Sequence, residues 1–185
     1  PDGAVEVLFG LNGRVRLGPD ARLVLDRIEE KARGQITMVR RRIRLEEGSI
    51  RVRVRQNTQC PVPVLVIGIG AEVTIGRPDL NVRGGVDAVL ERPARQAIGR
   101  VRVINGRVHV RRDAIGEFGA DELECGRKAQ LTIPPRETPL SARKALVTMD
   151  EEAWQAVQRR HAFAHEKDDA APYIPEPRND EMDGP

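Results

Sequence analysis

The stretch Ile50-Arg51-Val52-Arg53-Val54-Arg55 alternates apolar and charged residues without a break. Successive side chains of a β-strand point to opposite faces of the sheet, so this pattern places the aliphatic residues on one face and the arginines on the other. We expect a half-buried strand here, with a basic face formed by Arg51, Arg53 and Arg55.

The same period of two recurs in other parts of the chain up to about residue 133, for example at 15–17 and 107–111. Strand-sized runs with frequent turn residues and no convincing helical period predict an all-β domain. A short-stranded antiparallel β roll or sandwich and a solenoid-like domain both fit the pattern. Residues 23–32 do not alternate cleanly, which leaves one or two turns of helix as an alternative there.

The clearest turn signal is Asn105-Gly106, which lies between two alternating runs. Asn and Gly tolerate the positive φ angles that a type I′ turn requires. The sequence therefore predicts a hairpin between strands 100–104 and 107–112.

The composition describes a single domain with appendages. Of 185 residues, 39% are hydrophobic and only 3% are aromatic, so the core is expected to consist of Val, Ile, Leu and Ala. No apolar run approaches the roughly 18 residues that a membrane span needs, and the first residues do not resemble a signal peptide. The start at Pro1 leaves open whether a leader, a lipid anchor or a transmembrane helix precedes it.

The net charge of +3 hides an asymmetry, because residues 1–149 are basic and residues 150–185 are acidic. A basic body with an acidic tail attracts polyanions, or lets the tail lie back on the body or on a neighbouring copy. Nucleic-acid binding is disfavoured, since the β region has few aromatic residues for stacking and no recognition-helix motif.

The character of the chain changes after residue 133. Asp150 is a suitable N-cap, and the acidic residues that follow it favour the start of a helix that we expect over 150–166. Beyond it, the composition is acidic and proline-rich, which predicts disorder. We therefore divide the chain into a β domain at 1–135, a linker and helix at 136–167, and a tail at 168–185.

Four segments carry a family resemblance. They are Ile43–Val52, Arg77–Val89, Val101–Val110 and Leu123–Ala129. In order and spacing they resemble the FecR-like periplasmic domain family, in which a strand with a Gly turn precedes a Thr-Pro step, a Val-Arg-Gly-Thr segment, a hairpin with a central Gly and a closing Leu-x-x-Gly-Gln segment. This chain departs from that pattern at Arg77, Gly85 and Arg127.

The resemblance implies a non-catalytic β domain of the bacterial cell envelope that contacts other proteins. The anti-sigma segment, transmembrane helix and transporter-docking domain of better-known members are not recognisable in this sequence. We expect a scaffold or adaptor subunit of a larger periplasmic assembly, with homo-oligomers included among its partners. The alternative is the periplasmic sensory part of a FecR-type transmembrane regulator, and a polyanion-binding protein is a more distant one.

No residue pattern predicts catalysis or a cofactor. Gly68-Ile69-Gly70 lacks the third glycine of a dinucleotide-binding turn, so we read it as a bend between strands. The serines have no histidine placed to activate them. His161 and His165 lie one helical turn apart without a clear third ligand, and we expect no metal. His109 alternates with two valines and is expected at the surface.

The two cysteines, Cys60 and Cys125, form an even pair. Because the resemblance implies an oxidising compartment, one disulfide between them is permitted, with two reduced thiols as the alternative.

Most aromatic residues lie in the C-terminal appendage. Trp154 and Phe163, with Tyr173 and Ile174 beyond them, are the anchors that a short recognition element would use to bind another protein. The equal alternative for Trp154 is that its helix packs on the β domain of the same chain.

Overall fold

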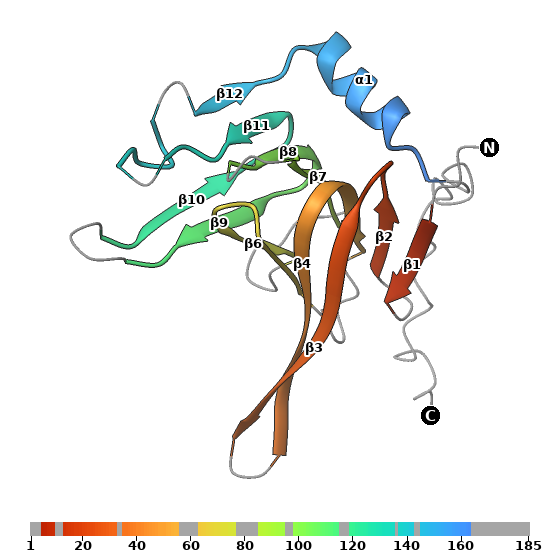
Figure 1. Ribbon diagram of the computed structural model, residues 1–185, viewed down its shortest axis with the longest axis vertical. Helices are drawn as coiled ribbons and strands as arrows, with labels where there is room; N and C mark the ends of the chain where they lie inside the picture. The colour runs from red at the N-terminus through yellow and green to blue at the C-terminus, as the bar shows by residue number, and fades with distance from the viewer. Residues whose placement is uncertain are drawn as a thin grey trace, which may run out of the picture.

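The structure is a computed structural model, and it describes residues 5–9, 13–32, 35–55, 63–76, 85–94, 98–114, 119–135, 137–142 and 145–163. The described strands form a curled β body that is followed by a helix (Figure 1). The all-β prediction with a C-terminal helix is therefore confirmed, and residues 23–32 form a strand rather than a helix.

One long strand, β4 (Gln35–Val54), belongs to both sheets of this body. Its C-terminal half lies in sheet A and its N-terminal half in sheet B. Sheet A has the order β1 (Val5–Phe9), β2 (Gly13–Leu17), β4, β7 (Val86–Arg92), β8 (Arg100–Asn105), β11 (Ala129–Thr132) and β12 (Leu146–Thr148). Its strands are antiparallel, as predicted.

Sheet B continues from the other half of β4. Its order is β3 (Arg22–Ala32), β4, β5 (Val64–Ile67), β6 (Glu72–Ile75), β9 (Val108–Arg112) and β10 (Asp121–Cys125). Among these pairs β4 and β5 are parallel, and the others are antiparallel. The far ends of β3 and β4 extend beyond the body as a two-stranded arm (Figure 1).

The core lies where the inner faces of the two sheets meet. Ile50, Val52 and Val54 are buried there, as the alternation predicts. Val15 and Ala88 lie on either side of Val52 in the register of sheet A, so aliphatic side chains form layers across the strands. Among the described residues, the core cluster consists of aliphatic side chains and Cys125, which confirms the prediction of a core without aromatic rings.

The predicted hairpin at Asn105-Gly106 is wrong. β8 pairs with β7 and β11 in sheet A, whereas β9 pairs with β6 and β10 in sheet B. Gly106 has a φ of 74°, and a Cβ there would lie 2.8 Å from the carbonyl oxygen of Gly85. The turn has the backbone conformation that the dipeptide favours, but it carries the chain from one sheet to the other.

The bend predicted at Gly68-Ile69-Gly70 is confirmed between β5 and β6. Gly68 has a φ of 98°, and a Cβ there would lie 2.3 Å from the backbone oxygen of Leu45. Ile69 is fully buried in the core. The glycines therefore bring a backbone bend close to β4 while the residue between them fills the core.

Helix α1 (Glu151–Arg160) begins at the predicted cap, because an Asp150 carboxylate oxygen accepts a hydrogen bond from the Ala153 N–H at 2.8 Å. It ends at Arg160, earlier than predicted. Within the described ranges, no helix combines the length and apolar composition that crossing a bilayer requires. The predicted tail at 168–185 lies outside the described residues.

Candidate functional site

The outer face of sheet A carries a buried cluster of two arginines and one aspartate. Arg51 donates from Nε and Nη2 to the two carboxylate oxygens of Asp87, at 2.9 and 2.7 Å. Arg53 donates from Nε to the same carboxylate at 2.9 Å. Only 1% of Arg51 is exposed, and the Asp87 carboxylate compensates its buried charge.

A second ion-pair group continues this face toward β8. Glu91 pairs with Arg102 and more loosely with Arg100, at 3.4 Å. Arg102 also donates from Nε to the side-chain oxygen of Gln130, at 2.8 Å. The polar face of sheet A therefore consists of Arg51, Arg53, Asp87, Glu91 and Arg102.

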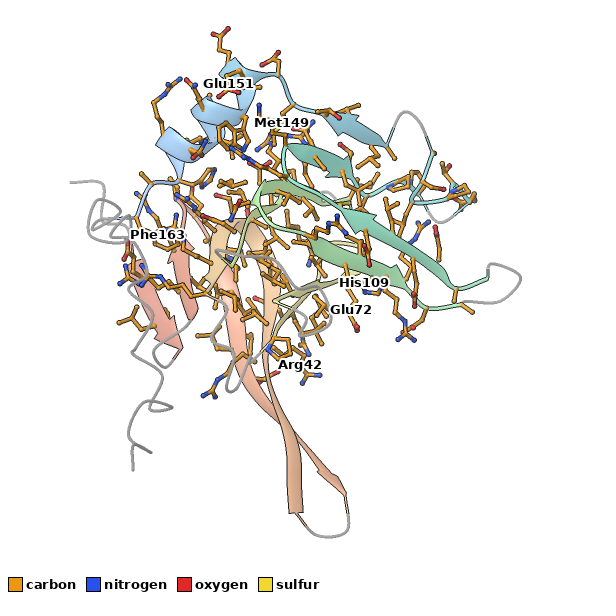
Figure 2. All side chains as sticks on the ribbon, turned by 180° about the vertical axis from the view of Figure 1, so that it is seen from behind. Arg42, Glu72, His109, Met149, Glu151 and Phe163 are labelled. Carbon is orange, nitrogen blue, oxygen red and sulfur yellow. The ribbon has the colours of Figure 1, made fainter. Side chains whose placement is uncertain are left out.

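The segment Glu151–Phe163, here called the C-terminal cover, lies against the polar face. Arg51 donates from Nη1 to the backbone oxygen of His161 at 2.9 Å, although the two residues are 110 positions apart. The Phe163 ring, labelled in Figure 2, has the guanidinium carbons of Arg51 and Arg53 at 4.8 and 4.7 Å from its centre. The arginines therefore hold both the backbone and the aromatic ring of the cover.

Val89 shows how completely the face is covered. Its register neighbours are Arg51 on β4 and Arg102 on β8, which places it on the polar face, and it does not belong to the core cluster. It is nevertheless 0% exposed. The outer side of sheet A at this point is thus as dry as its inner side.

His161 lies at the contact between the cover and the polar face. Its side chain is buried, and its Nε2 atom has no hydrogen-bond partner. Burial lowers the pKa of His161 from 6.5 to about 4, against the opposing effect of the Glu91 carboxylate, which raises it. The imidazole is therefore held in its neutral form.

Trp154 attaches the helix to the end of β8. Its indole N–H donates to the backbone oxygen of Ile104 at 3.1 Å. The Arg127 guanidinium carbon and the Lys128 Nζ lie over the Trp154 ring, 4.8 and 5.1 Å from its centre. Lys128 also forms an ion pair with Glu151 at 2.6 Å. The helix thus packs on its own β domain, which is the alternative that the sequence left open.

A second buried arginine holds the chain that leads to the cover. Arg112 donates to the backbone oxygens of Pro134, Pro135 and Thr138 and pairs with Asp121 at 2.9 Å. Asp121 in turn accepts from the Leu140 N–H at 2.6 Å. The sequence predicted a strand over 107–112 but gave no signal for this contact, because the residues that Arg112 binds lie more than 20 positions away in the loop after β11.

The basic face predicted from the alternation needs correction. Arg51, Arg53 and Arg55 do lie opposite the aliphatic side of β4, but they do not form one surface open to solvent. Arg51 is buried and Arg53 is mostly buried, because Asp87 and the cover lie over them. Arg55 alone of the three is exposed.

The predicted protein anchors have mixed outcomes. Trp154 and Phe163 both contact the β body of their own chain, which leaves their binding to another protein a prediction. Tyr173 and Ile174 lie outside the described residues. The sequence did not indicate Asp87 or the role of His161, although an aspartate inside the apolar run 86–90 is a signal for a buried partner.

The predicted disulfide stays a prediction. Cys125 is buried in the core, where burial raises the pKa of its thiol to about 11. Cys60 lies outside the described residues.

His109 was expected at the surface and is instead largely buried on the outer face of sheet B. Its Nε2 lies 3.4 Å from a carboxylate oxygen of Glu122 on β10. The alternation gave the correct face, but neighbouring side chains cover it. In Figure 2, the labelled His109 lies apart from Phe163 and the C-terminal cover.

No family model matches the sequence, and no curated protein matches it significantly. Two crystal structures of a "putative anti-sigma factor" from Parabacteroides distasonis share 15% identity with this chain, at TM-scores of 0.49 and 0.48. The matches cover 85% and 84% of this chain but only 60% and 59% of those chains. A likeness of this size carries no argument about family or function.

Proposed function

We propose that the protein is a non-enzymatic interaction module of the bacterial cell envelope, a periplasmic scaffold or adaptor that binds a polypeptide segment on the polar face of sheet A. The observation that carries this proposal is the way Phe163 is held. Two guanidiniums lie beside its ring, and one of them also binds the backbone oxygen of His161. Recognition of an aromatic side chain together with a backbone carbonyl suits peptide binding.

The composition of the polar face makes exchange of the bound segment feasible. Its arginines and carboxylates are paired with one another across β4, β7 and β8. Such a surface tolerates water when a segment leaves it, whereas an exposed aliphatic core would not. The C-terminal cover therefore serves as an intramolecular occupant that a partner segment of similar chemistry replaces.

Binding in trans tests this proposal. A labelled synthetic peptide with the sequence of residues 150–166 is added to the full chain carrying Phe163→Ala, and binding is followed by fluorescence anisotropy. We expect this peptide to bind about tenfold more tightly than the same peptide with alanine at position 163, because cation–π contacts contribute about 0.5–2 kcal/mol each.

The unmodified full chain is the matched control. Its own Phe163 occupies the position between Arg51 and Arg53, so it should bind the peptide more weakly than the Phe163→Ala chain does. Equal binding of the two peptides by the Phe163→Ala chain would contradict the proposal.

The second candidate is the sensory part of a FecR-type transmembrane regulator. The ordered motifs at 43–52, 77–89, 101–110 and 123–129 favour it, because they resemble the periplasmic domain of that family. A transmembrane segment encoded directly before Pro1 would support this role over a scaffold. Fractionation of cells that produce the protein from its native gene tests the periplasmic location that both candidates share.

A further inference from the structure

We propose that acid releases the C-terminal cover from the polar face, with protonation of His161 as the trigger. The inference rests on the proposed function, because it concerns regulation of the same surface. It starts from the position of His161, whose backbone oxygen is bound by Arg51 while its own ring is buried with Nε2 unpartnered. A side chain in this position has no acceptor ready for an added proton.

The charges around the ring oppose a second positive charge there. Arg51 of β4, Arg102 of β8 and Arg160 of α1 act on His161 from three elements, and among the described residues the carboxylate that opposes them is Glu91 of β7. Glu91 is already paired with Arg102. Protonation inside the contact would therefore add a cation to a buried site in which cations predominate.

The direction of the pH effect follows from the pKa. Because the pKa of His161 is lowered to about 4 when the cover is docked and is 6.5 when it is exposed, the released form takes up the proton more readily. Docking is at full strength above pH 6.5 and weakens as the pH falls toward 4. From these two pKa values, the docking constant should be about 20-fold lower at pH 5 than at pH 7.

Release of the cover leaves the β body intact. Helix α1 contains no fully buried residue, and the core lies on the other side of sheet A. A released helix of ten residues is only marginally stable in water, so its backbone amides should exchange with solvent once it leaves the sheet.

Hydrogen–deuterium exchange of the full chain tests the inference, in a His165→Gln background in which His161 is the one histidine after residue 150. After correction for the intrinsic pH dependence of exchange, the protection of the α1 amides should fall about 20-fold between pH 7 and pH 5. Amides of β7 and β8 should keep their protection. A loss of protection in both regions together would overturn the inference, because it would indicate unfolding of the body.

The variant His161→Leu keeps a buried, neutral side chain and should lose the acid-dependent fall, whereas His109→Gln on sheet B should retain it. A fall that persists in His161→Leu would overturn the inference. If His161→Leu is already undocked at pH 7, NMR titration of His161 in the unmodified chain decides. A pKa well below 6.5, with α1 protection lost as the ring protonates, supports the inference, and a pKa near 6.5 with protection retained overturns it.

The outcome is separable from that of the proposed function. Peptide binding to the Phe163→Ala chain is measured at neutral pH, where His161 is mostly uncharged in both states. If the peptide binds but acid does not release the cover, the regulation fails and the binding face stands.

Discussion

The two faces of sheet A are both buried, but by different chemistry. The inner face is aliphatic, with Ile50 and Val52 packed into the core, while the outer face carries Arg51 and Arg53 around Asp87. Ile50, Arg51, Val52 and Arg53 are successive residues of one alternating strand, β4. The difference shows that alternation specifies which side of a sheet a residue occupies, but not whether water reaches that side.

The largest effect should come from breaking the charge balance of the outer face. Asp87→Ala removes the carboxylate that binds the buried Arg51 guanidinium in a bidentate ion pair and should lower the free energy of unfolding by about 3–5 kcal/mol. Urea denaturation measures the change. If the loss is under about 1 kcal/mol, Arg51 reaches solvent or another partner and the outer face is less dry than the inner one.

A double variant sharpens this test. Arg51→Met combined with Asp87→Leu removes both buried charges and keeps apolar volume, so it should recover most of the stability that Asp87→Ala loses. Arg53 is partly exposed and can be solvated without Asp87. Recovery in stability without recovery of cover docking would separate the structural role of the ion pair from its role in holding His161 and Phe163.

The inner face should respond through packing alone. Ile50→Ala creates a cavity among fully buried aliphatic neighbours and should cost about 2–5 kcal/mol of unfolding free energy. The exposed Val147→Ala is the control and should change stability by less than about 0.5 kcal/mol. Similar losses from both substitutions would mean that Ile50 does not lie in a close-packed core.

A smaller effect is expected where the chain passes from sheet A to sheet B. Gly106→Ala must keep a positive φ and places its Cβ 2.8 Å from the Gly85 oxygen, so it should cost about 1–3 kcal/mol in urea denaturation. Gly126→Ala is the matched control, because a Cβ there would meet nothing within 4 Å. Equal stability of the two variants would show that the crossing adapts to a side chain.

Local patterns in the sequence predicted much of the fold. The alternation at 50–55 gave the correct faces of β4, and Asp150 gave the correct start of α1. The pairing of β8 and β9 was predicted wrongly, because an Asn-Gly turn fixes the backbone conformation of the turn and not the partners of the strands that flank it.

The candidate site was harder to predict because its parts are distant in sequence. Arg51 and Phe163 were both singled out, but as parts of separate surfaces, and no local pattern joins them to Asp87. A contact between distant residues also lies at the early end of α1, where Arg51 binds the carbonyl of His161 within the range 150–166 predicted as helix. Contacts of this kind depend on tertiary packing, which local propensity does not contain.

The smallest effect is expected at the exposed start of the cover, where the ion pair of Glu151 and Lys128 contrasts with the buried pair of Asp87 and Arg51. The hydrogen bond from Lys128 is the main cause that lowers the pKa of Glu151, and the hydrogen bond from Gln155 is the next. A lowered pKa means that this contact stabilises the fold above the ordinary pKa of 4.5 and that the contribution is lost as the pH falls through the folded-state value. Lys128→Met should therefore raise the pKa of Glu151 more than Gln155→Ala does, as measured by NMR titration. Because Glu151 is exposed to solvent, we expect Lys128→Met to leave the urea midpoint at pH 7 nearly unchanged. A large shift would show that the start of the cover stabilises the fold as strongly as the polar face does.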